Sequence, residues 1–394
     1  MYSITMIIKR EIYPKIEKFI KQPEAIVITG MRRVGKTTLL KQIMEDIESD
    51  NKIFFDLENP VNRKIFEEGD YEKIVDNLKA LGLRGKERGY VFLDEIQFVK
   101  NLPSIVKYLY DYYKIKFILS GSSSFYIKNL FSESLSGRKY IFELHPFTFK
   151  EFLKLKEVDL MLPKTARGIT VALFEKIDRF YDEYIRYGGF PGVVAKDSAE
   201  EKKMMLEDIF SAYFQLEITQ LGDFKKTGAI RDLMLLLMER TGSKLDILKL
   251  SKEIGVARDT IHNYISFLED TFFIKTIRPF SRNRDTEIRT APKFYLCDTG
   301  LVNHFSSVSA GALFENAVFL SLRNRGEVNY YQRKSGVEID FILDKKEAYE
   351  VKISGDKQDA KKLSALAAEL SLNNYSVVSK KFTAVPHITF GFLL

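Results

Sequence analysis

The sequence has very little cysteine and no long apolar run. Its one cysteine, Cys297, excludes an internal disulfide and fits a reducing compartment. Nowhere do about 18 apolar residues follow one another, as a membrane-spanning helix requires, and no apolar run follows a basic region at the start. The four histidines are scattered without metal-ligand spacing. We therefore expect a soluble, cytoplasmic protein with no membrane segment.

The chain is long enough for more than one hydrophobic core. Its 394 residues, of which 45% are hydrophobic, indicate two or three domains. The formal charge of +7 suits an anionic partner such as nucleic acid, but an ordinary solubility charge explains it equally well. Composition alone leaves the partner open.

Residues 30–37, Gly-Met-Arg-Arg-Val-Gly-Lys-Thr, fit the phosphate-binding pattern G-x-x-x-x-G-K-[ST] and follow an apolar run. Glycines let backbone N–H groups curl around phosphate oxygens, Lys36 adds positive charge, and Thr37 can hold Mg²⁺. The pattern predicts a site for ATP with Mg²⁺. The candidate nucleotide contacts are Gly30, Arg32, Arg33, Val34, Gly35, Lys36, Thr37, Thr38 and, further along the chain, Ser120.

Up to about residue 144, short β-branched and aromatic runs alternate with helical stretches. This alternation predicts an α/β fold with a parallel sheet covered by helices on both faces. The expected strands are residues 25–29, 53–57, 90–93, 116–119 and 140–144.

Two carboxylates follow the predicted strand at 90–93. Asp94 is expected beside the phosphate-binding loop, where it can bind Mg²⁺ through water, and Glu95 can deprotonate the attacking water. The predicted strand at 53–57 separates the two motifs, as in P-loop ATPases that place a glutamate beside the metal-binding aspartate.

Two further residues are candidates for the same site. The hydroxyl of Ser120 can contact the γ-phosphate or the water, although an ordinary turn or helix cap is equally consistent. Arg138 can stabilise the γ-phosphate in its own subunit or in a neighbour, or it can form a structural ion pair.

These motifs resemble those of the AAA-type ATPases of archaea and bacteria. More narrowly, the chain resembles a subfamily in which the ATPase is followed by a winged helix and a nuclease-like domain. The resemblance covers nearly the whole chain and implies ATP hydrolysis, while the physiology of that subfamily is poorly defined. The segments that carry it are residues 30–37, 93–97, 120–122, 136–138, 147–152 and 187–191.

The middle of the chain is predicted to be helical. Apolar spacing between residues 245 and 268 predicts two short helices joined at Gly255, a helix-turn-helix pattern. DNA binding is one interpretation, but such units also serve as protein-contact modules, and the acidic Asp259 lies on the proposed reading face. The expected DNA contacts are Arg258, Thr260, Asn263 and Tyr264 of the second helix and, in a wing, Arg278, Arg282, Arg284 and Arg289.

The C-terminal segment is predicted to form a β-hairpin that carries carboxylates. If the hairpin centres on residue 345, Asp340 and Glu350 lie opposite each other, and Lys352 shares the face of Glu350. Facing carboxylates repel, so a divalent cation or the lysine must balance them. Glu315, on a predicted helix, is a plausible further metal-linked carboxylate.

This constellation resembles the PD-(D/E)xK nucleases, although Ile339 stands where their proline precedes the aspartate. The resemblance implies that Glu315, Asp340 and Glu350 hold Mg²⁺ or Mn²⁺ and that Lys352 positions the nucleophile. A solvated strand face is the alternative explanation for the Glu-x-Lys pair.

We therefore predict an ATPase whose hydrolysis is coupled to DNA binding and metal-dependent DNA cleavage. The alternatives are a signalling or scaffold ATPase whose inactive nuclease-like domain binds protein or nucleic acid, and a nucleotide-binding scaffold with little turnover. A homo-oligomer follows if Arg138 acts in a neighbouring subunit. The predicted parts are an AAA-type P-loop ATPase domain (1–150), a helical lid or connector (151–226), a winged helix-turn-helix (227–290) and a PD-(D/E)xK nuclease-like domain (291–394).

Overall fold

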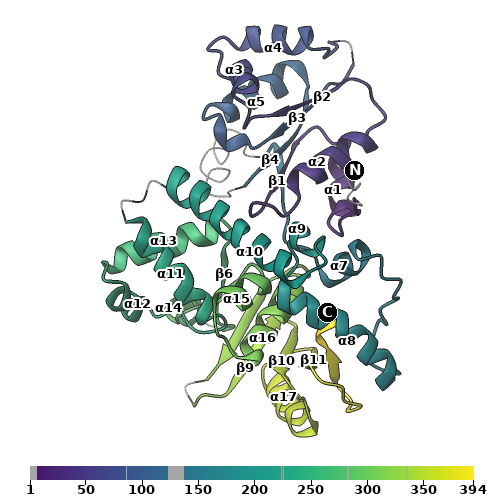
Figure 1. Cartoon of the computed structure of the whole chain (residues 1–394), viewed down its shortest axis with the longest axis vertical. Coiled ribbons are helices and arrows are strands. Elements are labelled where there is room, and N and C mark those ends of the chain that lie inside the picture. Colours follow the sequence, from purple (N-terminus) through teal and green to yellow (C-terminus); the bar gives the residue numbers. More distant parts are fainter. Residues whose placement is uncertain are drawn as a thin grey trace. The chain divides into compact units, whose positions relative to one another are not determined.

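The chain folds into two compact units in a computed structural model that describes residues 7–85, 87–122, 137–222, 224, 226–281, 284–333 and 335–394 (Figure 1). The first unit comprises the chain up to His145 together with Asp270–Phe272, and the second comprises Pro146–Glu269 and Phe273–Leu394. Within the described ranges, no helix combines the length and the apolar character needed to cross a bilayer.

A five-stranded parallel sheet forms the first unit, with the strand order β2-β3-β4-β1-β5. The five predicted strands are confirmed, with ends shifted by about one or two residues. The predicted strand at 53–57, which separates the two motifs in sequence, is β2 at the sheet edge, and β4 lies between β1 and β3. Helical crossovers allow strands that follow each other in sequence to be separated in the sheet. The strands are β1 (Ala25–Thr29), β2 (Lys52–Asp56), β3 (Tyr90–Asp94), β4 (Lys116–Gly121) and β5 (Lys139–Glu143).

Helices cover both faces of this sheet (Figure 1). Alternate strand residues face opposite sides, and Val27, Val91 and Leu119 share one apolar core with α3, α4 and α5. The helices α1 and α2 pack against β1, β3 and β4. Burial on both faces explains why these strands read as continuous apolar runs. The helices are α1 (Tyr13–Ile20), α2 (Lys36–Asp46), α3 (Pro60–Phe66), α4 (Tyr71–Ala80) and α5 (Leu102–Tyr113).

The second unit begins with helices. They are α7 (Phe149–Leu155), α8 (Val171–Tyr187), α9 (Pro191–Val194) and α10 (Ala199–Tyr213), and α10 continues as a π-helix over Phe214–Leu221. Gly188 ends α8 at a φ of 78°, and the Gly189 amide donates to Asp298, with 2.7 Å between nitrogen and oxygen. A Cβ atom on Gly189 would lie 2.4 Å from the carbonyl oxygen of Phe147. Gly188 is therefore required by its backbone conformation, and Gly189 by the close approach of the Phe147 backbone.

The predicted pair of short helices joined at Gly255 is confirmed, since Gly255 ends α12 at a φ of 73°. Arg258 and Asn263 are exposed on α13, but Tyr264 is buried because its ring packs edge-on against Phe224, with 5.0 Å between ring centroids. The prediction that Tyr264 is exposed was wrong. The elements are α11 (Thr227–Glu239), α12 (Ile247–Ile254), α13 (Arg258–Asp270), β6 (Ile274–Ile277), α14 (Arg284–Arg289), β7 (Lys293–Leu296) and α15 (Thr299–Phe305).

The strands β6 and β7 pair antiparallel and form a two-stranded ribbon, here called the β6–β7 ribbon. The predicted domain boundary at residue 290 lies between these two strands. The strand β7 therefore belongs to the segment that we assigned to the C-terminal domain. Arg282, a predicted wing residue, lies outside the described residues.

A mixed five-stranded sheet completes the second unit, with the order β12-β11-β10-β9-β8. The strands β8, β9 and β10 are antiparallel neighbours, while β10, β11 and β12 run parallel. Tyr349 pairs with Phe341 and Ala348 with Ile342, which confirms a hairpin centred on residue 345. The elements are α16 (Ala310–Leu322), β8 (Val328–Gln332), β9 (Glu338–Leu343), β10 (Glu347–Lys352), α17 (Lys357–Glu369), β11 (Asn374–Ser379) and β12 (Ile388–Phe390).

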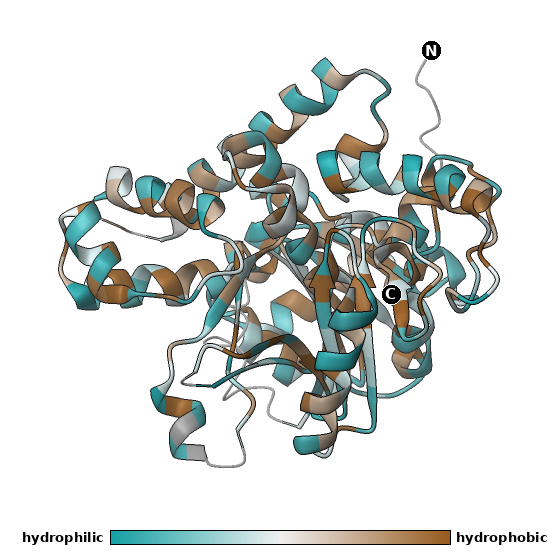
Figure 2. Ribbon diagram, turned by 90° about the horizontal axis from the view of Figure 1, so that it is seen from below, coloured by the Kyte–Doolittle hydropathy of each residue, from teal (hydrophilic) through white to brown (hydrophobic). Residues whose placement is uncertain are grey.

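The helix α17 closes one face of this sheet. Ala360 and Leu363 of α17 pack with Ile342 and Val377 of the strands. Figure 2 shows apolar and polar residues alternating along the helices, as expected for amphipathic helices that cover a core.

Candidate functional site

The predicted phosphate-binding loop joins β1 to α2, as the sequence pattern requires. Gly30 and Gly35 have φ angles of 151° and 95°, and Arg33 between them has a φ of 66°. A Cβ atom on Gly30 would lie 2.1 Å from the carbonyl oxygen of Leu144. Glycine is therefore needed at both ends of the loop, at Gly30 for close approach and at both positions for backbone conformation.

The side chain of Lys36 is held by the loop itself. Lys36 is 5% exposed, and its Nζ donates to the carbonyl oxygens of Gly30 at 2.9 Å and Met31 at 3.0 Å. The helix α2 begins at Lys36, so the positive end of its dipole points into the loop. Thr37 and Thr38 are exposed in the first turn of that helix.

Two hydroxyls hold the carboxylate of Asp94, which is only 2% exposed. Thr37 Oγ1 donates to Asp94 Oδ2 at 2.5 Å, and Ser120 Oγ donates to Asp94 Oδ1. Burial raises the pKa of Asp94, and these two hydrogen bonds partly counteract it. The prediction that Ser120 contacts a phosphate needs correction, because this hydroxyl is fully buried and serves Asp94 instead.

The side chain of Glu95 lies next to this carboxylate. Glu95 has a left-handed backbone with a φ of 54°, and its amide donates to Asp94 Oδ1 at 3.1 Å. Gln97 Nε2 donates to Glu95 Oε2 and, at 3.1 Å, to Ser122 Oγ. Gln97 thus orients the predicted base, a role that sequence analysis did not assign. The neighbouring serines of the predicted motifs, Ser123, Ser124 and Ser136, lie outside the described residues.

Arg138 lies at the amino ends of the strands, whereas the phosphate-binding loop lies at their carboxyl ends. The carbonyl oxygen of Arg138 accepts a hydrogen bond from the amide of Ala25, the first residue of β1. The phosphate-binding loop follows Thr29, the last residue of β1. At about 3.3 Å per residue, the five residues of β1 separate the Arg138 backbone from the loop by roughly 16 Å. Arg138 Nη2 lies 3.4 Å from Asp111 Oδ1. The geometry favours the structural ion pair over a γ-phosphate contact within the same subunit, and a contact with a neighbouring subunit stays a prediction.

Arg10 is a residue of this site that sequence analysis missed. Its side chain is buried, and it donates to the carbonyl oxygen of Val34 at 2.8 Å and to that of His145 at 2.7 Å. One guanidinium group therefore ties the loop to the segment that leaves β5. An isolated arginine 20 residues before the loop carries no sequence signal of this role.

The residues present fit a nucleotide with Mg²⁺. The loop offers an ammonium group and the start of a helix for phosphates, while Thr37 and Asp94 offer the hard oxygen ligands that Mg²⁺ prefers.

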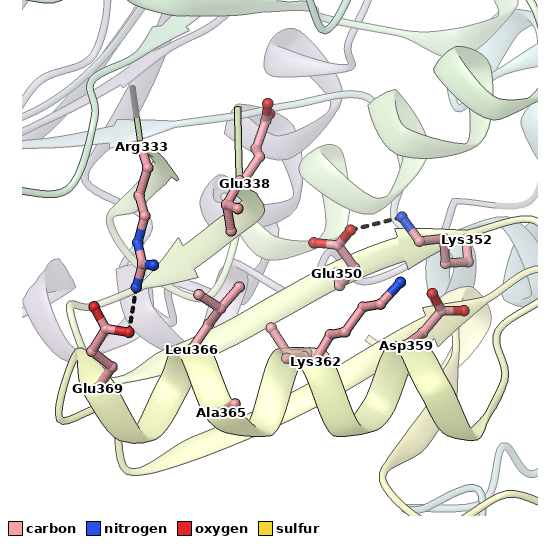
Figure 3. Close-up of a pocket in the computed structure, with 11 residues that line it drawn as sticks. Arg333, Glu338, Glu350, Lys352, Asp359, Lys362, Ala365, Leu366 and Glu369 are labelled. Atoms are coloured by element: carbon pink, nitrogen blue, oxygen red, sulfur yellow. Dashed lines mark hydrogen bonds and ion pairs between the residues drawn. The ribbon is translucent and has the colours of Figure 1, made fainter. Parts of the chain in front are cut away.

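The second candidate site lies on the C-terminal hairpin, beside a cavity of about 620 Å³ between β9, β10 and α17. Glu350 Oε1 pairs with Lys352 Nζ at 2.7 Å, and Figure 3 shows both side chains together on β10 above α17. The carboxylate of Asp340 accepts from the Val351 amide at 2.7 Å. Burial and then the charge of Asp340 raise the pKa of Glu350 to about 7.

Glu315 of α16 belongs to the same electrostatic cluster. Burial, followed by the charge of Asp340, raises the pKa of Glu315 to about 7. Tyr295 donates to Glu315 Oε1 at 2.7 Å, and Lys293 Nζ lies 3.7 Å from the same oxygen. Lys293 also forms a close ion pair with Glu338. Sequence analysis missed Lys293. A lysine that begins an apolar strand could have indicated a buried cation with an acidic partner.

The predicted metal ligands do not fit a metal ion in their present arrangement. Their carboxylate oxygens suit Mg²⁺ or Mn²⁺, but within the described ranges no three histidine, cysteine or carboxylate side chains are grouped so that they could hold an ion. Protein groups satisfy each carboxylate instead: Lys352 at Glu350, the Val351 amide at Asp340, and Tyr295 with Lys293 at Glu315.

Comparison with known families agrees with the first unit. Residues 22–153 match the family described as "AAA domain", and this match agrees with the loop geometry of the first unit. Residues 178–312 and 310–387 match two families described as domains of unknown function, DUF8612 and DUF4143.

Several known proteins are similar to the chain over most of its length. An uncharacterized protein of Methanocaldococcus jannaschii is 29% identical over 370 residues, which cover 89% of this chain and 80% of that protein. An uncharacterized protein of Haemophilus influenzae is 27% identical over 332 residues, which cover 81% of this chain and 79% of that protein. A solved structure, a Walker-type ATPase of Pyrococcus abyssi, has a TM-score of 0.48 and 15% identity, covering 76% of this chain and 96% of that one.

Proposed function

We propose that the first unit binds and hydrolyses ATP. The observation that carries this proposal is the convergence of Lys36, Thr37 and Asp94 at the carboxyl edge of the sheet, with Glu95 beside them. An AAA-type domain match over residues 22–153 supports it.

Each residue has a distinct role in this proposal. Lys36 and the loop amides bind the β- and γ-phosphates, and Thr37 with Asp94 would hold Mg²⁺, which neutralises phosphate charge when bound. Glu95 accepts the proton of the attacking water. Gln97 keeps the Glu95 carboxylate in place, since the amide of Gln97 donates to it.

Replacing the base separates hydrolysis from binding. Glu95→Gln should lower kcat by about 100-fold or more while ATP binding persists, because a positioned general base contributes roughly 10²–10⁴-fold. Lys36→Ala should abolish tight ATP binding. Glu67→Gln, an exposed glutamate at the end of α3, is the matched control. If the parent already hydrolyses ATP negligibly and Glu95→Gln changes nothing, the scaffold alternative stands.

We further propose that ATP hydrolysis is coupled to DNA binding by the helical part of the second unit. The α12–α13 pair and the exposed Arg258 and Asn263 on α13 support this proposal, as does the formal charge of +7. If the parent binds DNA no better than Arg258→Ala at several salt concentrations, the protein-contact alternative is preferred.

Metal-dependent cleavage by the C-terminal sheet stays a prediction. Its support is the order helix, three antiparallel strands, helix and parallel strand, together with Asp340 and Glu350, which adjoin the paired residues Phe341 and Tyr349 of the hairpin. A cleavage assay on branched, single- and double-stranded DNA, with and without ATP, tests it. Identical behaviour of the parent and Glu350→Ala would exclude a nuclease and leave a binding module for protein or nucleic acid.

A further inference from the structure

The acidic cluster of the C-terminal sheet contains a lysine that comes from another element. Lys293 is the first residue of β7 in the β6–β7 ribbon, while the carboxylates belong to α16 and β9. Its Nζ pairs closely with Glu338 and lies 3.7 Å from Glu315 Oε1. The Lys293 side chain is only 8% exposed, and its Nζ lies 5.6 Å from the centre of the Tyr330 ring. The ammonium group is thus enclosed by two carboxylates and an aromatic ring.

The direction of the Glu338 side chain agrees with this arrangement. In Figure 3 the carboxylate of Glu338 points away from α17, whereas Glu350 and Lys352 lie over that helix. Glu338 also accepts from Gln332 Nε2 at 3.0 Å, and Gln332 in turn accepts from Lys244, which precedes α12. A continuous polar network therefore joins the carboxylates to the helical part of the unit.

We propose that Lys293, rather than a divalent cation, is the resident counter-cation of Glu315 and Glu338 in the C-terminal carboxylate site. The inference rests on the proposed role of these carboxylates and concerns how the negative charge of that site is balanced. It also explains why the predicted metal ligands, although chemically suitable, are not grouped to hold an ion.

The physical reason is charge balance in a confined space. Buried carboxylates need a positive partner, and Lys293 supplies one without any ion from solution. A divalent cation bound at Glu315 would lie within a few ångströms of the ammonium group and be repelled by it. The lysine and the metal ion therefore compete for the same negative charge.

The origin of Lys293 links the site to the ribbon. Lys293 pairs with Ile277 of β6 and forms a bridge with Lys244.

Metal binding by lysine variants tests the proposal in the full chain, without nucleotide or nucleic acid. Lys293→Met should have a lower Tm than the parent in metal-free buffer and should bind Mn²⁺ with a Kd at least about tenfold lower, measured by calorimetry and by the Mn²⁺-dependent rise in Tm. Lys244→Met is the matched control, since Lys244 Nζ also lies 5.6 Å from the Tyr330 ring but bonds a neutral partner. It should respond to Mn²⁺ as the parent does.

A second substitution shows where the ion binds. Adding Glu315→Gln to Lys293→Met should abolish the gain in Mn²⁺ affinity. If Lys293→Met does not fold, Lys293→Met with Glu338→Gln removes both partners of the close pair and should show the same gain.

An unchanged Mn²⁺ response in these lysine variants overturns the proposal. The assay contains neither ATP nor DNA, so this result leaves the proposed ATPase and DNA binding untouched. Conversely, a gain in Mn²⁺ affinity without DNA cleavage by any variant would reject the nuclease prediction and retain the role of Lys293.

Discussion

Replacing Arg10 by methionine should weaken ATP binding although Arg10 lies far from the loop in sequence. The side chain of Arg10 holds the carbonyl of Val34, the residue before Gly35, and the carbonyl of His145. Methionine keeps the apolar stem but removes both donors. The loop would then lose its tie to the segment after β5.

The size of the effect follows from these two contacts. Hydrogen bonds from charged donors contribute about 1.5–3 kcal/mol each, so the free energy of unfolding should fall by roughly 3–6 kcal/mol, and by less if water reaches the carbonyls. Reordering one loop residue on binding costs about 1–2 kcal/mol. Since about 1.4 kcal/mol corresponds to a factor of ten, the Kd for ATP should rise roughly tenfold.

Arg88 provides a matched control on the same sheet. It also donates to two backbone carbonyls, those of Lys21 at 2.7 Å and Gln22 at 2.6 Å, but it precedes β3 and lies at the edge away from the loop. Arg88→Met should lower stability without changing ATP affinity.

Binding of a fluorescent ATP analogue and steady-state kinetics would measure the difference. For Arg10→Met we expect a KM raised about tenfold with kcat changed less than about threefold, because Glu95 and Asp94 keep their contacts. Arg10→Lys should restore part of the affinity through one of the two bonds. Equal Kd values for folded Arg10→Met, Arg88→Met and the parent would refute the reasoning.

Three further changes test the structural basis of both units. Burial raises the pKa of Asp298 to about 6. The folded protein therefore binds more protons than the unfolded chain between about pH 4 and 6, and stability falls as pH rises through that window. Asp298→Asn should reduce the change in the free energy of unfolding across this pH window by about 3 kcal/mol, measured by urea unfolding at several pH values. The same pH dependence in Asp298→Asn and the parent would contradict the assignment. Gly189→Ala should lower the Tm by several degrees, because its Cβ atom would lie 2.4 Å from Phe147 O, and a Tm equal to that of the parent would argue against this close approach. Gly30→Ala should abolish ATP binding, because its Cβ atom would lie 2.1 Å from Leu144 O, and intact binding would show that the loop tolerates a different path.

Much of the first unit was predictable because its signals are local. The loop pattern specifies which residues need glycine conformations, and continuous apolar runs mark strands that are buried on both faces. The hairpin around residue 345 was predictable for a similar reason, since pairing register follows from turn position and period-two alternation. The order of the strands in the sheet was not predicted, since no local signal in the sequence indicates that β4 lies between β1 and β3.

Single side chains were harder to place than elements. Ser120 was assigned to a phosphate and is buried against Asp94. Tyr264 was assigned to an exposed face and is buried against Phe224. A helical or strand pattern gives the face of a residue only when its neighbours in space are known, and these neighbours come from other elements.

The amino-acid sequence by itself therefore determined the chemistry that each local motif can offer: a phosphate-binding loop, a strand ending in Asp94 and Glu95, and a hairpin with facing carboxylates. Only the tertiary structure decided what meets those motifs. It brought Arg10 to the loop, set Arg138 at the far edge of the sheet, and placed Lys293 among the C-terminal carboxylates. The physical reason is that hydrogen bonds and ion pairs depend on distance in space, and the packing of the sheets brings together residues that have no local relation in sequence.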